Sequence, residues 1–532
     1  MDGGKIAAID DASAVDHEMD GGEFVCPAFI DSHVHLLLGG RALSHAHLAG
    51  VSSREEFERV IRAKHESLPN DVWLEASGWD QGNWQEHSQR HAQMDAQMNA
   101  SVNANMNTQT QTQSKSPTQI HAQKNSTHHM PDHTWLASCG NRPAIAWRMD
   151  QHVCVVNRAA LNIIAQRHDL SRDPVGGTIA RDAAGNPTGL LLEQAAWKLA
   201  IPCVPEPNSA ALRQSAHAAA RHLHAHGIAT VGSMEYSRDL ISTLSPLRHE
   251  LNLRIRATIL DREWPVDWSL GQCVTADDAL RILGFKSFID GTLGSRTARM
   301  LEPYCDAPEQ QGMFVELAES GKISEWMREG LSRGWSMSVH AIGDAALRAA
   351  LDAADAAEKS GVRARESLRI EHGQTAHASD ISRCKDRWLS MQPLHKYFDA
   401  APALTRLGLP RMDRFFCFKQ FHQAGARLAF GSDWPIVEPD CLQAMQTAIT
   451  GATFGGAITR AQSNISAEIA LQAFTCNAAE YLRANDTCGA LKVGHAADIV
   501  SLDRDPITMD WSQNKPNIRF TCVAGMTAPA TH

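Results

Sequence analysis

Short apolar runs alternate with amphipathic stretches along most of the chain. Eight of these runs have the length and apolar content of buried strands. They are Phe29–His35, Ala229–Met234, Leu253–Leu260, Ile282–Ile289, Met337–His340, Ser367–His372, Trp388–Gln392 and Arg427–Asp433. Helical patterns lie between them, for example at Ser209–His226 and Ala346–Lys359. Strands separated by helices indicate a parallel sheet, and eight repeats predict an α/β fold, a (β/α)₈ TIM barrel with its chemistry at the C-terminal strand ends.

Two parts of the chain fall outside this repeat. Residues 45–227 separate the first two strands. That is too long for a strand-to-helix connection, so we predict a lid subdomain inserted after barrel strand 1, over the barrel mouth. The chain ends carry β-like segments at Lys5–Ile9, Ala497–Leu502 and Ile518–Val523. We predict that residues 1–27 and 485–532 form a small β-sandwich, and that residues 28–484 form the barrel with its lid.

Residues 85–133 differ in composition from the rest of the chain. The tract is rich in Gln, Asn, Ser, Thr, Met and His and has no aliphatic pattern. Such a segment buries too little apolar surface to offset its ordering entropy, so we predict a disordered surface loop. Its histidines at 121, 128 and 129 lack the fixed geometry that a catalytic site needs.

Ionisable residues stand at or near the C-terminal ends of five predicted strands. They are His33, His35, Lys286, His340, His372 and Asp433. Strand alternation places His33 and His35 on one face, so both imidazoles can reach a single ion. Burying such groups costs several kcal/mol unless they are paired or bind a metal. Singly, each residue has an ordinary explanation, such as a turn-forming Asp or a snorkelling Lys. Together they converge on one barrel face and predict a metal site.

Composition and charge exclude several classes of protein. The 532 residues carry a formal net charge of −10, which argues against a nucleic-acid binder with a basic surface. The sequence contains no run of about 18 apolar residues, so it predicts no membrane span. It also shows no secretory signal. The 12 cysteines are scattered and form no CxxC pair, as expected of buried thiols in a reducing compartment. We therefore expect a cytoplasmic protein that binds neither nucleic acid nor membrane.

Motifs along most of the chain resemble, in order, those of the amidohydrolase superfamily, in particular amidohydrolase family 3, the YtcJ-like proteins, and the N-substituted formamide deformylases. They are PAFIDSHVHLLLGG, GWDQGNW, RPAIAWRMDQHVCVVNRAAL, GFKSFIDGTLGSRTA, SVHAIGDAA, RIEHGQ, MQPLH, GSDWPI and GHAADIVSLDRDP. The chain departs from the family pattern at Ala28, where the family usually has Gly, in its short N-terminus and in the Gln/Asn-rich insertion.

The resemblance implies a role for each strand-end residue. His33, His35, His340 and His372 would bind one or two divalent ions, Asp433 would bind metal and move the proton, and Lys286 would be carbamylated. A protonated lysine could not bind beside cations, whereas a carbamate is an anionic oxygen donor. Imidazole and oxygen donors suit Zn²⁺, although manganese, iron or nickel are not excluded.

The mechanism expected from this site is hydrolysis of a small-molecule amide. A metal-activated hydroxide would attack the carbonyl carbon of a non-peptide C–N bond, with Asp433 as the catalytic base. Five residues in the matching motifs are candidate substrate contacts: Trp79, His152, Arg296, His395 and Trp434. Trp84 is a further aromatic candidate, although each Trp could equally pack the lid core. A homodimer is compatible with these expectations.

Three other functions are alternatives to amide hydrolysis: a different reaction at the same metal site, non-catalytic binding and polynucleotide deamination. The same ligands would support lactone, ester, phosphoester or N-acyl amino acid hydrolysis, or decarboxylation, and only the pocket or an assay separates them. A non-catalytic binding protein of this fold would typically lose ligands, yet all six positions are present. A polynucleotide deaminase needs an HxE…PCxxC signature, which this sequence lacks.

Overall fold

The computed structural model describes residues 3–9, 24–69, 72–80, 130–149, 151–174, 176–363, 367–454 and 461–527. The chain divides into two compact units, one formed by residues 1–44 with 207–532 and the other by residues 45–206. The predicted lid was to extend to residue 227. The structure instead places residues 207–227 in the first unit, because the apolar face of helix α5 (Ser209–Ala225) packs against α1 (Leu36–Ala42) and into the barrel core.

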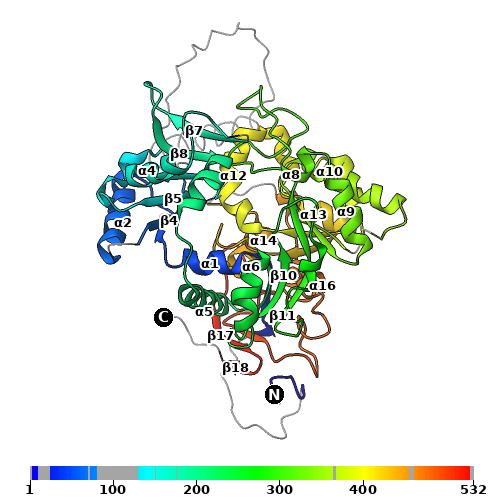
Figure 1. Ribbon diagram of the computed structural model, residues 1–532. Helices are drawn as coiled ribbons and strands as arrows, with labels where there is room; N and C mark the ends of the chain where they lie inside the picture. The colour runs from blue at the N-terminus through cyan, green and yellow to red at the C-terminus, as the bar shows by residue number, and fades with distance from the viewer. Residues whose placement is uncertain are drawn as a thin grey trace, which may run out of the picture. The chain divides into compact units, whose positions relative to one another are not determined.

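The first unit contains the predicted barrel of parallel strands (Figure 1). In sheet order the strands are β15 (Arg427–Phe430), β14 (Trp388–Met391), β13 (Leu368–His372), β12 (Ser336–Ala341), β11 (Leu280–Phe288), β10 (Arg254–Ile259), β9 (Ile228–Glu235) and β2 (Phe29–Val34). Each coincides with a predicted strand. Nearly all their residues are buried, as expected when helices cover the outside of a parallel sheet.

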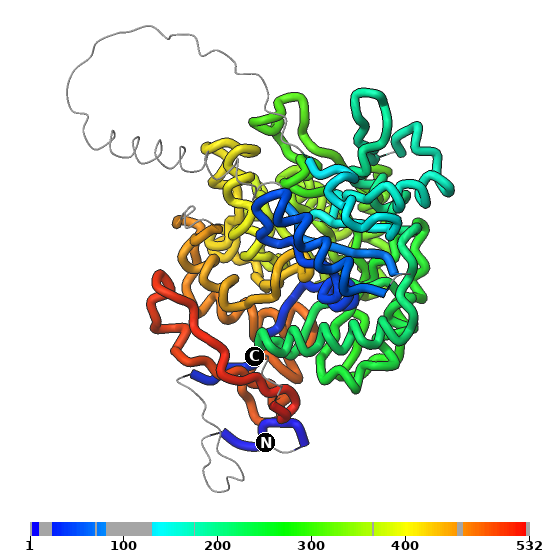
Figure 2. The backbone as a smooth tube through the Cα atoms, turned by 90° about the vertical axis from the view of Figure 1, so that its left-hand side faces the viewer, coloured from blue at the N-terminus to red at the C-terminus, as the bar shows by residue number. Residues whose placement is uncertain are grey.

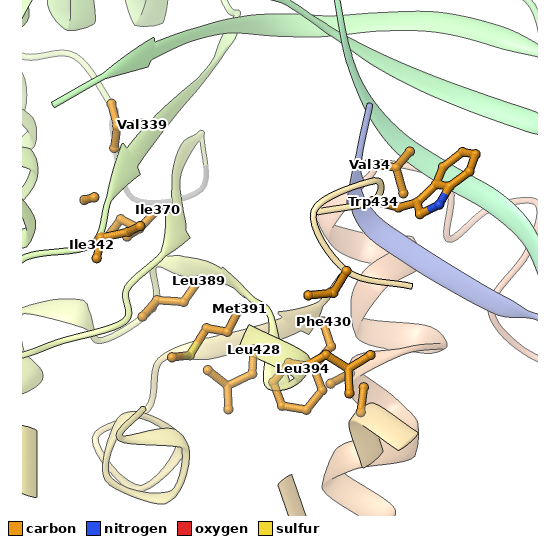
Figure 3. Packing of buried hydrophobic residues seen from close by; sticks show 14 of the residues in the cluster. Val34, Val339, Ile342, Ile370, Leu389, Met391, Leu394, Leu428, Phe430 and Trp434 are labelled. Atoms are coloured by element: carbon orange, nitrogen blue, oxygen red, sulfur yellow. The ribbon is translucent and has the colours of Figure 1, made fainter. Parts of the chain in front are cut away.

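The first and last barrel strands meet through the backbone just beyond their ends. Val34 forms an isolated parallel bridge with Trp434, and Figure 3 shows these two side chains together. The Asp433 amide donates to the His33 carbonyl at 2.7 Å, and the His35 amide donates to the Trp434 carbonyl at 2.8 Å. The ends of β2 and β15, which carry three predicted site residues, are therefore held in fixed register.

Helices follow most barrel strands and present small or branched apolar residues to the core. In α10 (Asp344–Lys359), for example, Leu347 and Leu351 are buried while Asp352 is exposed, as expected for an amphipathic helix. The other helices of four or more residues in this unit are η5 (Leu240–Leu244), η6 (Trp268–Gln272), α8 (Glu316–Glu319), α9 (Ile323–Ser332), α11 (Ala378–Ile381), α12 (Pro393–Leu407), η8 (Leu409–Arg414), α13 (Phe418–Gln423), α14 (Cys441–Thr450), α15 (Ala467–Ala473) and α16 (Cys476–Tyr481). Shorter turns are α6 (Ser237–Asp239), α7 (Ser245–Leu247), η7 (Ser382–Cys384) and η9 (Ala461–Ser463).

The two ends of the chain meet in a small antiparallel sheet of this same unit. Its order is β1 (Phe24–Pro27), β16 (Ile499–Leu502), β17 (Ile518–Val523) and β18 (Met526–Thr527). Figure 2 shows the red C-terminal strands beside blue N-terminal segments. The predicted strand at Lys5–Ile9 was wrong: Lys5 makes one isolated bridge to Ala496, and β1 supplies the N-terminal strand. The described residues form one sheet here, so the second sheet of a sandwich is not confirmed.

The second unit is built on a mixed sheet. Its order is β3 (Ala46–His47), β4 (Leu74–Trp79), β5 (Ala144–Arg148), β6 (Val153–Val156), β8 (Pro187–Glu193) and β7 (Gly177–Arg181). Helices α2 (Arg54–Ser67), η2 (His133–Cys139), α4 (Arg158–Arg167), η3 (Ala196–Ala200) and η4 (Ile201–Cys203) complete it. The Gln/Asn-rich tract lies outside the described residues except for residues 130–133, and so does Trp84.

Two expectations from composition concern the chain as a whole. All 12 cysteines are free thiols, and most are buried, as scattered cysteines without pairing motifs predicted. Among the described residues, no helix is both long enough and apolar enough to cross a membrane.

Candidate metal centre

The His33-Val34-His35 segment presents two imidazoles to one carboxylate. The Nε2 atoms of His33 and His35 each lie 3.3 Å from Asp433 Oδ1. The backbone beyond His35 is held by β9, whose Ser233 hydroxyl accepts from the Leu36 amide and whose Glu235 carboxylate accepts from the Leu37 amide. These bonds cap the first turn of α1, which has no cap of its own. Strand alternation therefore brought the two histidines together as predicted.

Glu371 orients the His33 ring. Its Oε2 lies 2.7 Å from His33 Nδ1, and its Oε1 accepts from the Tyr481 hydroxyl at 2.5 Å. Burial would raise the pKa of Glu371, but the neighbouring His33 and Lys286 hold it at about 2. An ionised carboxylate only accepts, so His33 Nδ1 carries a hydrogen and the ring presents its Nε2 towards Asp433.

His372 is oriented in the same way from the next strand along the sheet. Its Nδ1 lies 2.8 Å from Gln392 Oε1, while Gln392 Nε2 donates to the Ser390 carbonyl. The Gln392 oxygen is therefore an acceptor, and His372 keeps its Nε2 lone pair free.

His372 and Asp433 have φ angles of 74° and 62°. A left-handed backbone at a non-glycine residue costs about 1–3 kcal/mol and often accompanies functional geometry.

His340 and Lys286 lie against the same group of histidines. The His340 ring is 4.4 Å from the His372 ring, centroid to centroid, and its Nε2 donates to the Gly291 carbonyl at 3.1 Å. Lys286 Nζ lies 3.0 Å from His33 Nε2, and burial lowers the pKa of this amine. The structure thus brings all six predicted metal-site residues into one cluster, with His340 joined to it through its ring contact with His372.

His395 belongs to this cluster too, although sequence reasoning placed it only as a substrate contact. Its Nε2 is buried, lies 3.8 Å from Asp433 Oδ2 and has no hydrogen-bond partner in the part of the chain that the structure describes. His372, His395 and Asp433 offer donor atoms that all lie within 4.8 Å of one another, as do His33, His35 and Asp433. Asp433 is shared by both groups.

The charge balance of the cluster depends on Asp433. Burial would raise the pKa of its carboxyl, but His33, His35 and His372 lower it well below the usual value, so it is ionised. Two lone-pair imidazoles and one carboxylate, gathered with an unpartnered buried nitrogen, are the donors that a divalent metal needs. The residues present therefore fit the metal that the sequence predicted.

Asp31 and Asp290 accept hydrogen bonds from backbone amides next to the cluster. Neither was singled out from the sequence. Asp31 accepts hydrogen bonds from the His33 amide and from the amide and hydroxyl of Ser432. Asp290 accepts from the amides of Ile342, Gly343 and Arg299, and its Oδ1 is 3.8 Å from His340 Nε2. Burial raises the pKa of Asp31 to about 6 and of Asp290 to about 7.

Substituting Gly431 by alanine tests how closely the two strand ends must approach. A Cβ at Gly431 would lie 2.6 Å from the His33 amide nitrogen and 2.8 Å from Asp31 Oδ1. We expect Gly431→Ala to destabilise the protein by about 1–3 kcal/mol in urea unfolding and to reduce bound metal. Gly50→Ala is a control for metal content: its Cβ meets no atom within 4 Å, although the φ of 78° adds backbone strain of its own. Wild-type stability and metal content in Gly431→Ala would show that the approach is not required.

Glu371→Gln tests whether the carboxylate orients His33. The amide keeps the shape but loses the charge that fixes the Nδ1 hydrogen, so metal affinity should fall about 10–100-fold. Competition with a chelator of known affinity measures this loss. Tyr481→Phe removes only the supporting hydroxyl and should show a smaller effect in the same direction. Equal metal affinity in wild type and Glu371→Gln would refute the orienting role.

The other predicted substrate contacts have partners of their own. Arg296 forms a two-point ion pair with Asp306, at 3.1 and 2.6 Å. Trp434 is buried, and its ring stacks on His222 with the centroids 5.2 Å apart. In the second unit, Trp79 is a core residue that donates to the Ala146 carbonyl, and His152 Nδ1 lies 2.8 Å from Glu193 Oε2. Their role in substrate binding stays a prediction.

Comparison with known proteins identifies the family of the chain. A sequence model of the amidohydrolase family matches residues 21–113 and 124–528, nearly the whole chain. The chain belongs to the amidohydrolase family. This amidohydrolase-family protein is 26% identical to the putative amidohydrolase YtcJ of Bacillus subtilis, over 92% of the chain and 86% of that protein. It is 23% identical to the N-substituted formamide deformylase of Arthrobacter pascens, over 94% and 86%.

Two further similarities concern a plant protein and solved structures. The amidohydrolase-family protein is 28% identical to LONG AFTER FAR-RED 3 of Arabidopsis thaliana, over 94% of the chain and 81% of that protein. Its fold is similar to an uncharacterized metal-dependent hydrolase from Pyrococcus horikoshii, with a TM-score of 0.68 and 24% identity over 92% of this chain and 88% of that one. A counterpart from Pyrococcus furiosus gives 0.64 and 25% over 91% and 88%.

Proposed function

We propose that this amidohydrolase-family protein is a metal-dependent hydrolase that cleaves a non-peptide C–N bond in a small-molecule amide, with Asp433 as the proton carrier. The observation that carries the proposal is the position of the Asp433 carboxylate. Its Oδ1 lies 3.3 Å from two imidazole Nε2 atoms, and its Oδ2 lies 3.8 Å from a third. A buried, ionised carboxylate among lone-pair nitrogens is suited to holding a cation and accepting a proton.

The metal would be held by His33, His35, His340, His372, Asp433 and a carbamylated Lys286. Zn²⁺ is the ion that these nitrogen and oxygen donors suit best, with one or two ions per chain. When bound, such a metal lowers the pKa of water towards about 7 and polarises a carbonyl oxygen. Hydrogen bonds to Glu371 and Gln392 orient the rings of His33 and His372, so that each would present its Nε2 to the ion.

Asp433 would take a proton from the water that attacks the carbonyl carbon and deliver it to the leaving nitrogen. The carboxylate is ionised, as a proton acceptor must be, and its two oxygens face different imidazoles. His395 would contact the carbonyl or amide of the substrate, because its Nε2 is buried and has no hydrogen-bond partner among the described residues. Similarity to an N-substituted formamide deformylase favours formamides among the amides.

An activity panel tests the proposal. Metal-loaded protein would be assayed with N-aryl and N-alkyl formamides, N-acyl amino acids, cyclic amides, lactones and a phosphoester. We expect release of amine from at least one amide, and at least about 100-fold slower release from Asp433→Asn prepared in the same way. Turnover of lactones or phosphoesters alone would reject the C–N specificity while keeping a hydrolase. No turnover of any compound by protein with bound metal would favour a binding protein.

A further inference from the structure

A second group of metal-type donors lies outside the barrel rim. His222, near the end of α5, His226, which follows the helix, and Glu438, in the loop between β15 and α14, offer ligand atoms that all lie within 4.8 Å of one another. None of the three belongs to the cluster around Asp433. The rings of His222 and His226 lie 4.7 Å apart, centroid to centroid, and a carboxylate completes a ligand set that zinc commonly takes.

A backbone hydrogen bond fixes the tautomer of His226. Its Nδ1 lies 2.9 Å from the His222 carbonyl oxygen, which can only accept, so Nδ1 carries the hydrogen. The lone pair is therefore on Nε2. A backbone carbonyl that fixes the tautomer in this way is the usual outer partner of a metal-binding histidine. Burial also lowers the pKa of His226, which favours the neutral imidazole that binds metal.

His222 and Glu438 complete the group. His222 Nε2 lies 2.9 Å from Glu438 Oε2, so the carboxylate is already aimed at the ring nitrogen that would bind an ion. The two side chains are 23% and 62% exposed, which leaves a route for an ion from solvent. The last turn of α5 adds the negative end of a helix dipole, which favours a cation.

We propose that His222, His226 and Glu438 form a second, external binding site for a zinc-like divalent cation, distinct from the catalytic cluster. The ion would join the end of α5 to the loop that carries Asp433. The His222 ring stacks on Trp434 at 5.2 Å with an interplanar angle of 22°, and Trp434 directly follows Asp433. A bound ion would therefore also hold the outer face of the Trp434 ring.

Counting bound zinc tests this site without any need for a substrate. Metal-free full-length protein would be dialysed against buffered Zn²⁺ and its zinc content measured by mass spectrometry. We expect wild type to bind one zinc per chain more than His226→Ala and more than Glu438→Ala. His217→Ala is the matched control, since His217 lies on α5 and faces Glu250 at 3.5 Å instead. It should bind as much zinc as wild type.

A second measurement separates loss of the site from loss of the fold. The unfolding temperature of each metal-free variant serves as the reference for its own zinc response, so any effect of Glu438→Ala on the fold itself is removed from the comparison. Added zinc should then raise the unfolding temperature of Glu438→Ala less than that of His217→Ala, because one stabilising ion is missing. Histidines 121, 128 and 129 are unchanged in all variants, so any zinc bound to them contributes equally to each protein and does not affect the differences between variants. Equal zinc content in all four proteins would overturn the proposal, and so would equal thermal shifts.

Discussion

Asp433→Asn is expected to retain near wild-type metal content while turnover falls by about 10²–10⁴-fold, the usual contribution of a general base. Asparagine preserves the size of the side chain and one oxygen donor, but it cannot accept the proton of the attacking water. The geometry supports a separation of these roles, because Asp433 Oδ1 faces His33 and His35 whereas Oδ2 faces His395. Metal analysis and amine release on the same preparation measure both quantities.

Asp277→Asn is the matched control for that substitution. Asp277 precedes β11, at the opposite end of the barrel strands, where its carboxylate pairs with Arg248 at 2.7 Å. The same chemical change there should leave turnover unchanged. Full activity in Asp433→Asn would remove this residue from the mechanism. Loss of both metal and activity would show that its main task is to bind the ion.

The barrel strands were predictable because each is a short apolar run bounded by polar residues. Burial on both faces of a parallel sheet produces that pattern locally, so β9 or β12 can be recognised without knowing its neighbours. The partner of a terminal strand is not encoded in this way. Strand β1 pairs with β16 across more than 470 residues of chain, from Phe24 to Leu502, and the β-like run at Lys5–Ile9 forms only one bridge.

The boundary of the inserted unit shows a related limit. The pattern of α5 reveals a buried face, with Ala216, Ala220 and Leu223 in the core. Amphipathicity does not specify which surface that face meets. A helix before the second barrel strand could therefore be placed in the insertion, whereas it packs on α1 within the barrel unit.

The metal cluster was largely predictable because its residues end strands of one barrel. Glu371 was missed for a physical reason. Strict alternation would turn it away from the face that carries His372, yet its carboxylate contacts His33 at 2.7 Å. The left-handed φ of His372 interrupts the alternation at the end of β13. A sequence pattern that assumes regular strand geometry does not contain this change of direction.

Lys286 is the residue whose chemistry depends most on its surroundings. It is 2% exposed, and its Nζ lies 3.0 Å from His33 Nε2 and 4.9 Å from the centre of the Phe288 ring. Burial lowers the pKa of the amine, although Glu371 and Asp433 act in the opposite direction. A neutral amine can add to CO₂, forming a carbamate and releasing a proton. The positive charge beside the histidines would then be replaced by an anionic oxygen donor.

Lys286→Ala is therefore expected to lower metal content and to reduce turnover by more than about 100-fold. Loss of a residue that only hydrogen-bonds a metal ligand costs up to about 100-fold, and loss of a ligand itself should cost more. Removing a buried four-carbon side chain leaves a space that a small carboxylate can enter. Formate, acetate or propionate, titrated into Lys286→Ala with metal, should restore part of the activity, because each supplies the missing oxygen donor. Lys286→Arg is the control, since it keeps the charge, leaves no such space and should not be rescued. Unchanged activity in Lys286→Ala, or rescue of both variants alike, would argue that the lysine acts as an amine and not as a carbamate.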